Sequence, residues 1–456
     1  MRIYNKLLLS LIACIIATPI VSAQDYRTSE LNTIGEAPSS EWMEKYIQTL
    51  VDFGTRHTLS DTTSNTRGIG AARRWIKTEF ERISEECGGC LEVFYVGDTI
   101  EGTRRIPNPT EVVNVIAIQR GTTDPNRMIM MSGDIDSRVS DPLDGTSDSP
   151  GANDNASGVA GVIEAARVLS KYEFNGSIVY AALSGEEQGL FGGAILAEYA
   201  KENNWRLKGV LNNDMIGNIE GINGIINNTT ARVFSEGTRY VETEREANMR
   251  RFTGGEVDSP SRNLARYVNK MADLYIRNLD VMMVYRLDRF GRGGHHRPFN
   301  EAGYPGVRIM ETNEHYDRQH QDLRNEDGRH YGDTIEYVDF DFAAKLTGLN
   351  AVTMASIAWA PNPPANVEIS GAVRPSTTLS WDALNKEQNP QLAGYKIYWR
   401  LTDSSTWDNS IFVGDVTEYT LENVVIDNFF FGVASVSKDG FESPVVFPGP
   451  AGSFGE

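Results

Sequence analysis

Short apolar runs alternate with amphipathic stretches along the chain between residues 110 and 360. The runs have the length and the β-branched content of buried strands, and the stretches between them have the apolar spacing of helices. The predicted strands are EVVNVIAIQ, RMIMMSG, SIVYAALSG, GVLNNDMIG and GVRIMET, and the predicted helices are ASGVAGVIEAARVLSKY, GLFGGAILAEYAKEN, SRNLARYVNKMADLYI and DFDFAAKLTGLNAVTMASIAWA. This order predicts an α/β fold in which helices sandwich a mostly parallel sheet.

A different pattern follows Pro361-Asn362-Pro363-Pro364, which reads as a linker. The segments NVEISG, TTLSWDAL, GYKIYWRL, YTLENV and FFFGVASVSKDG are short, strand-like and separated by turn residues. They predict a small all-β, immunoglobulin-like sandwich over residues 361–456. The strand with Trp381, the GYKIYWR strand and the ending FGVASVSKDGFES resemble a fibronectin type III domain over residues 362 to about 447. The main α/β domain is then expected over residues 24–360.

The N-terminus has the pattern of an export signal. Arg2 and Lys6 precede an apolar run that starts at Leu7, and Val21-Ser22-Ala23 is a small-residue cleavage site. We therefore expect residues 1–23 to be a signal peptide and the mature protein to be exported, either periplasmic or secreted. Lipoprotein processing at Cys14 is the alternative, but the apolar run continues past it. The run is short for a membrane span and no second one follows, so no integral membrane span is expected.

The net charge bears on which partners the protein can bind, and the cysteines bear on whether it contains a disulfide. The net charge is −19, and no lysine or arginine cluster forms a basic stripe, so we expect no nucleic-acid partner. Cys87 and Cys90 are the cysteines that remain after signal cleavage. A C-x-x-C pair can be redox-active, half of a zinc site or a small disulfide, and in an oxidising compartment we expect the disulfide.

Carboxylates follow the predicted strands where each strand ends. Because the carboxyl ends of parallel strands share one edge of a sheet, these side chains should lie close together. Unpaired, they would repel one another, so divalent metal ions are the natural compensation. The residues are Asp134 and Asp136 after RMIMMSG, Asp154 in the next loop, Glu186 and Glu187 after SIVYAALSG, and Asp214 after GVLNN. Five of the six histidines lie between His295 and His330, which also indicates a functional face.

Four motifs together resemble one family. GANDNASGVAG, LSGEEQGLFGG, LNNDMIG and QHQDLR match, in order and spacing, the co-catalytic zinc exopeptidases, which include bacterial leucyl aminopeptidases and glutaminyl cyclases. The resemblance covers roughly residues 110–350 and implies a zinc aminopeptidase-like fold. It also implies roles for five residues: a bridging metal ligand at Asp154, a general base at Glu186, and metal ligands at Glu187, Asp214 and His320.

The segment Gly133-Asp134-Ile135-Asp136-Ser137 departs from that pattern. The family has H-x-D-S here, so Asp134 stands where the first ligand histidine belongs. A carboxylate can also bind zinc, so we expect Asp134 to be a ligand. Asp136 is expected in the catalytic set, supporting Asp134 or ligating in its place. His296, in HHRPF, falls at the family's aspartate–histidine pair before Pro-Phe; it resembles a substrate-contacting histidine, and a structural role stays open.

Two metal ions are therefore expected. Zinc should occupy the Glu187/His320 site, because a nitrogen ligand favours zinc, and zinc or a harder ion such as manganese or magnesium should occupy the Asp134/Asp214 site.

We predict an exported, metal-dependent exopeptidase, an aminopeptidase that hydrolyses N-terminal peptide bonds with a metal-bridged hydroxide. Its expected partners are peptide substrates. Two alternatives stay open: a glutaminyl cyclase-like transferase, and a non-catalytic binding protein with a decayed metal site. The linker predicts that residues 1–360 form a complete enzyme and that the sandwich serves docking to a cell surface or matrix, targeting or stability.

Overall fold

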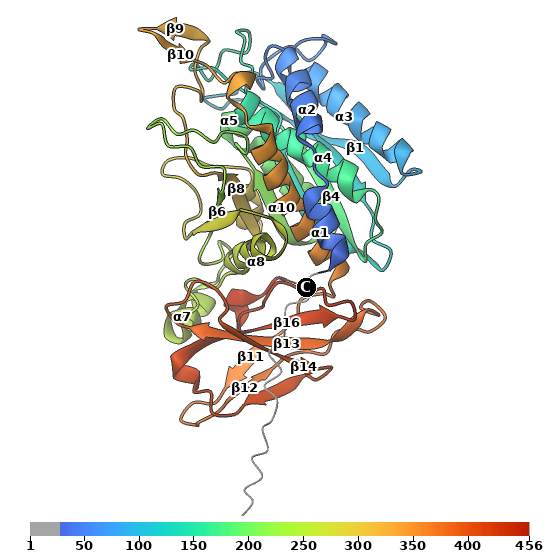
Figure 1. Cartoon of the computed structure of the whole chain (residues 1–456), viewed down its shortest axis with the longest axis vertical. Coiled ribbons are helices and arrows are strands. Elements are labelled where there is room, and N and C mark those ends of the chain that lie inside the picture. Colours follow the sequence, from blue (N-terminus) through green and yellow to red (C-terminus); the bar gives the residue numbers. More distant parts are fainter. Residues whose placement is uncertain (1–27, 456) are drawn as a thin grey trace, which may run out of the picture.

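The computed structural model describes residues 28–455 and contains two units (Figure 1). An α/β unit is followed by a smaller β-sandwich, which lies below it in this view, next to helices α7 (Glu244–Thr253) and α8 (Pro260–Tyr275). The expected signal peptide, its cleavage site and the alternative at Cys14 lie outside the described residues. Within residues 28–455, no helix combines the length and the apolar character that crossing a bilayer requires.

The α/β unit is built on one eight-stranded sheet in the order β1-β2-β4-β3-β5-β8-β6-β7. The central strands β4, β3, β5 and β8 are mutually parallel, whereas the β1–β2, β2–β4 and β8–β6 pairings are antiparallel. The predicted mostly parallel sheet is therefore confirmed. The strands are β1 (Leu91–Ile100), β2 (Thr110–Gln119), β3 (Asp124–Asp134), β4 (Gly176–Leu183), β5 (Arg206–Asn213), β6 (Thr230–Ser235), β7 (Asp280–Val284) and β8 (Gly306–Glu311).

Helices cover both faces of this sheet because alternate strand residues point to opposite sides. In β3, Ile129 and Met131 belong to the larger core, while Met128 and Met130 belong to the core on the other face. The larger core also takes side chains from α1 (Ser29–Glu36), α2 (Ser40–Asp52), α3 (Gly68–Glu86), α4 (Gly158–Leu169), α8 and α10 (Phe340–Trp359). The other face is covered by α6 (Phe191–Glu202) and α9 (His296–Glu301).

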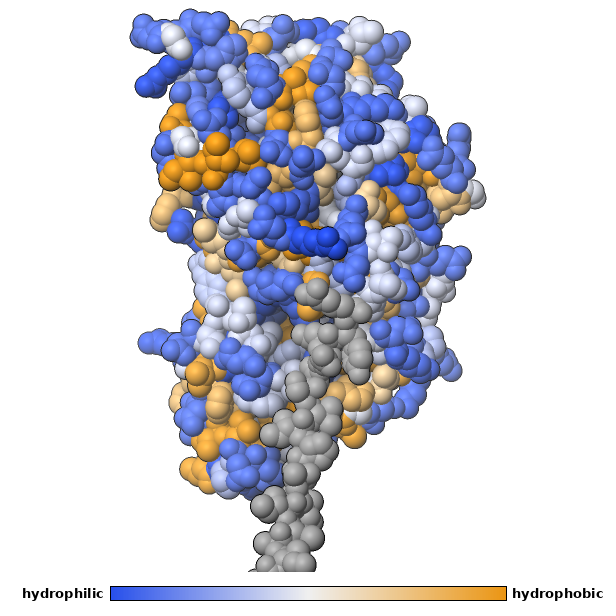
Figure 2. Space-filling view, in the orientation of Figure 1, coloured by the Kyte–Doolittle hydropathy of each residue, from blue (hydrophilic) through white to orange (hydrophobic). Residues whose placement is uncertain are grey.

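The outer surface is mainly polar. Hydrophilic side chains cover most of the face shown in Figure 2, and apolar ones appear there in small groups. Near one end of the α/β unit, the short strands β9 (Arg324–Glu326) and β10 (Arg329–Tyr331) form a projecting hairpin (Figure 1).

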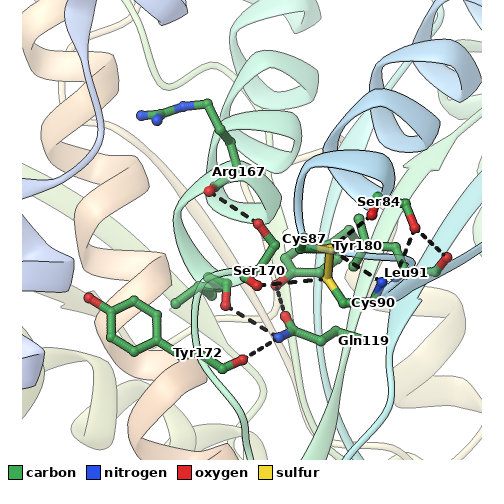
Figure 3. Close-up of a disulfide and its surroundings, with 10 residues drawn as sticks. Ser84, Cys87, Cys90, Leu91, Gln119, Arg167, Ser170, Tyr172 and Tyr180 are labelled. Atoms are coloured by element: carbon green, nitrogen blue, oxygen red, sulfur yellow. Dashed lines mark hydrogen bonds between the residues drawn. A yellow bond between two sulfur atoms is a disulfide. The ribbon is translucent and has the colours of Figure 1, made fainter.

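The predicted disulfide is confirmed: Cys87 and Cys90 are bonded in the turn between α3 and β1 (Figure 3). Ser84 ties the same turn, because its hydroxyl donates to the Leu91 carbonyl and accepts from the Leu91 backbone N–H. The bridge precedes Leu91, which pairs with Gln119 of β2, and Gln119 pairs with Ile178 near the start of β4. It therefore lies near the end of the sheet opposite to the one where Glu186 and Glu187 follow β4.

The C-terminal unit consists of two three-stranded antiparallel sheets, ordered β11-β12-β15 and β14-β13-β16. Between them lies a core that includes Trp381 and Tyr395, whose ring centroids are 5.2 Å apart. The strands are β11 (Glu368–Ser370), β12 (Thr377–Ser380), β13 (Leu392–Leu401), β14 (Asn409–Gly414), β15 (Glu418–Leu421) and β16 (Phe429–Ser437). The small β-sandwich is therefore present as predicted.

Buried charges join the two units. Asp258, which precedes α8, is fully buried and contacts Arg266 on α8 at 2.8 Å and Arg400 on β13 at 2.8 Å. The Trp359 ring at the end of α10 stacks on Phe441 of the sandwich at 4.8 Å between centroids. The Asp258–Arg400 and Trp359–Phe441 contacts cross from one unit to the other, so the units share a packed interface and are not held by a linker alone.

Candidate metal centre

The ends of three neighbouring parallel strands bring the acidic residues together. The backbone register places Asp134, the last residue of β3, beside Leu183 of β4, and Gly133 beside Asn213 of β5. Glu186 and Glu187 follow β4 on the short helix α5 (Glu186–Gly189), and Asp214 follows β5 directly. The expected common rim is thus present in the structure.

Three of the expected metal ligands converge. His320 Nε2 lies 3.0 Å from Asp154 Oδ2 and 2.7 Å from Glu187 Oε1. Within residues 28–455 these three residues are the one group of histidine, cysteine and acidic side chains whose ligand atoms all lie within 4.8 Å of one another. His320 Nε2 is buried and makes no hydrogen bond of normal geometry. One histidine nitrogen and two carboxylate oxygens this close together form a donor set that fits a zinc ion.

Surrounding groups fix this trio. Arg138 donates from Nε to Glu187 Oε2 at 2.7 Å, and its Nη2 lies 2.8 Å from His320 Nδ1. The backbone N–H of Asp154 donates to the Asp333 carboxylate at 2.6 Å. Asp154 Oδ2 and Glu187 Oε1 are the oxygens that remain close to His320 Nε2.

The two carboxylates of the trio create a negative potential that favours a cation beside them. Burial alone would lower the pKa of His320, but Glu187 and Asp154 outweigh it and raise this pKa to about 9. Burial acts to raise the pKa of Asp154, yet the His320 ring holds it below its ordinary value. Without another cation, the histidine proton neutralises the carboxylates. A divalent ion can take over that role.

Glu186 stands beside the trio without joining it. It lines a cavity of about 860 Å³ together with Asp154, Glu187, Asp214 and His320. Burial and then the neighbouring Glu187 carboxylate raise the pKa of Glu186 well above its ordinary value. A raised pKa makes a carboxyl group hold a proton more readily, which suits a residue that accepts a proton and then donates it.

Asp136 does not face the metal trio. Its carboxylate accepts hydrogen bonds from the backbone N–H of Glu186 at 3.1 Å and of Glu187 at 3.0 Å, and from the Thr58 hydroxyl at 3.0 Å. The structure therefore places Asp136 under the glutamate turn, where it fixes the positions of both glutamates. This differs from the expected contact with Asp134.

Asp134 and Asp214 do not belong to this trio, and each has a protein partner. Asp134 Oδ1 is 2.5 Å from His295 Nδ1, and its Oδ2 accepts from Asn155 Nδ2 at 2.8 Å. Asp214 Oδ2 is 2.5 Å from Arg308 Nη2. Sequence reasoning missed both His295 and Arg308. The signal for Arg308 was a positive charge between apolar residues of the predicted strand GVRIMET.

His296 is fully buried and is not among the residues that line the cavity. Its Nε2 lies 2.8 Å from the Leu287 carbonyl oxygen and 3.7 Å from Asp288 Oδ2. Burial lowers the pKa of His296 to about 4, so the ring is neutral at physiological pH. The placement favours the structural role over contact with substrate.

The chain is similar to proteins of one peptidase family. The family model described as Peptidase family M28 matches residues 114–338. A probable zinc metalloprotease of Leptosphaeria maculans is 43% identical over 422 residues, which cover 92% of this chain and 97% of that protein. One from Pyrenophora teres f. teres is 42% identical over 425 residues, covering 92% of this chain and 87% of the relative.

Among solved structures, the LapA aminopeptidase of Legionella pneumophila is similar with a TM-score of 0.53 and 20% sequence identity, over 74% of this chain and 77% of that one. This likeness concerns the fold. The family-model match and the extensive identity to the fungal relatives together show that the chain belongs to peptidase family M28.

Proposed function

We propose that the protein is an exported zinc exopeptidase, and specifically an aminopeptidase. The observation that carries this proposal is the convergence of Asp154, Glu187 and His320 beside Glu186 in one cavity. The names of the fungal relatives support zinc and proteolysis. The aminopeptidase part rests on the motif resemblance and on the fold likeness to a protein whose title names that activity.

Asp154, Glu187 and His320 would hold the zinc ion. When bound there, zinc would polarise the scissile carbonyl and lower the pKa of a water molecule. Glu186 would accept a proton from that water and pass it to the leaving amine. Arg138 would keep Glu187 in its ligating orientation, and Asp136 would hold the backbone of both glutamates through the contacts described above.

We also propose roles for the N-terminal segment and for the C-terminal sandwich. Residues 1–23 would direct export, and amino-terminal sequencing of the mature protein should then begin at Gln24. The C-terminal sandwich resembles a fibronectin type III domain, and we propose that it combines structural support of the α/β unit with docking to a cell surface or matrix.

The test is metal-dependent hydrolysis by the full chain. Chelator-treated protein should be inactive on aminoacyl chromogenic substrates and should regain activity with zinc, while N-acetylated substrates should not be cleaved. His320→Gln should abolish activity. His330→Gln, a change to an exposed histidine of the β9–β10 hairpin, is the matched control and should not. Cyclisation of glutaminyl peptides without hydrolysis would favour the transferase, and silence in both assays with zinc present would favour a binding protein.

A further inference from the structure

Arg308 is an unusual residue for the middle of a sheet. It lies on β8, paired in register with Asn212 of β5, and its side chain is fully buried. Its Nη1 donates to both oxygens of Asp288, at 3.1 and 3.2 Å, and to the Gly293 carbonyl at 2.6 Å. Both acceptor residues belong to the segment between β7 and α9, and these three contacts hold the guanidinium in place.

The remaining amino group of Arg308 points at the expected second metal site. Nη2 is buried, and its close contact is Asp214 Oδ2 at 2.5 Å. A guanidinium is charged at any physiological pH. One oxygen of Asp214 therefore already faces a fixed positive charge, and only Oδ1 is left for another ligand.

Both oxygens of Asp134 already have protein partners. His295 Nδ1 contacts one oxygen and the Asn155 amide donates to the other. A metal ion here would compete with a buried histidine and a buried amide for the lone pairs of Asp134, and it would also have to lie close to the guanidinium, which repels it. The donor set and its charges do not fit a metal ion in this half of the centre.

We propose that Arg308 takes the place of the second metal ion, so that the protein holds one zinc ion, at Asp154, Glu187 and His320. This inference rests on the metal centre of the proposed function. The fixed cation then neutralises Asp214 and, with His295 and Asn155, keeps the Asp134 half closed. The family resemblance implied a co-catalytic pair, and the substitution of Asp134 for the first ligand histidine agrees with its loss.

The direct test is the metal count of the full chain. Protein incubated with excess zinc and desalted should contain one zinc per chain by plasma mass spectrometry and by native mass spectrometry. Asp134→Asn should keep that count at one, and His320→Gln should reduce it to zero. Two zinc ions per wild-type chain, or a count that falls in Asp134→Asn, would overturn the inference while leaving the peptidase proposal intact. A count of zero in the wild type would overturn both.

A second variant tests the role of Arg308 itself. Arg308→Met keeps the length of the side chain and removes the charge, which leaves Asp214 and Asp288 without their common partner. If the variant folds, as judged by circular dichroism, it should bind a second divalent ion, zinc or manganese, that the wild type does not bind. A folded Arg308→Met protein that still holds one ion would contradict the claim that the guanidinium replaces a metal. If it does not fold, the wild-type and Asp134→Asn counts decide alone.

Discussion

The buried carboxylate of Asp258 at the interface between the two units should contribute strongly to the stability of the protein. Asp258 is fully buried, and both of its cationic partners, Arg266 and Arg400, are at most 2% exposed. Replacing Asp258 with asparagine keeps the shape of the side chain and removes the only charge that both arginines share. Breaking a buried ion pair from one side costs about 3–5 kcal/mol, because the remaining charge stays buried without compensation. We expect the free energy of unfolding of Asp258→Asn to fall by that amount.

The assay is urea unfolding followed by tryptophan fluorescence and circular dichroism. The control is Asp415→Asn, which removes the partner of Lys386 in an ion pair on the sandwich surface, where the two side chains are 45% and 75% exposed. Water screens such a pair, so the control should unfold almost as the wild type does. If Asp258→Asn unfolds at the same urea concentration as Asp415→Asn, the buried charge of Asp258 does not stabilise the protein.

The same interface affects the stability of a chain from which the sandwich has been removed. The linker composition predicts that residues 1–360 are a complete enzyme, but removing the sandwich would expose Asp258 and Arg266 and the Trp359 ring. A chain ending at residue 360 should therefore lose stability, and a soluble truncated protein with wild-type unfolding behaviour would restore the expectation drawn from the sequence.

Three further predictions concern single side chains. Glu186→Gln should bind zinc as the wild type does and lose about two to four orders of magnitude in turnover, and near-normal turnover would end its assignment as the proton carrier. Asp136→Asn should lower kcat about 10–100-fold, because an amide cannot accept from both glutamate N–H groups, and an unchanged kcat would show that this contact is dispensable. Burial raises the pKa of Glu236 from 4.5 to about 7, so its contribution to stability is complete below pH 4.5 and is lost as the pH rises through 7. The urea midpoint of Glu236→Gln should therefore fall less between pH 5 and 8 than that of the wild type, and parallel curves would contradict this.

Much of the fold could be predicted because its central strands contain short, buried apolar runs. All eight residues of β4 are buried, so its run stands out in the sequence. The strands β1, β6 and β7 were missed. Two of them, β1 and β7, lie at the edges of the sheet and most of their residues are at least partly exposed, and the short β6 carries Arg232 between its apolar residues. Edge strands have no continuous apolar run and give little signal in a single sequence.

Some features of the site could likewise be predicted from the sequence, and others could not. Glu186, Glu187 and Asp214 could be predicted to share one rim because each follows a buried strand. The contact of Arg308 with Asp214 could not, since it depends on which strand pairs with β5 and in which register. Asp136 was placed in the right region, but its acceptance of two backbone N–H groups depends on the turn that α5 makes after β4.

The central claim is a zinc centre formed by Asp154, Glu187 and His320. The most direct measurement is an anomalous difference map from a zinc-soaked crystal, recorded at the zinc absorption edge. We predict one peak, within about 2.0–2.2 Å of His320 Nε2 and of one oxygen each of Asp154 and Glu187. A map without a peak at these three residues, or with its peak between Asp134 and Asp214 instead, would contradict the account.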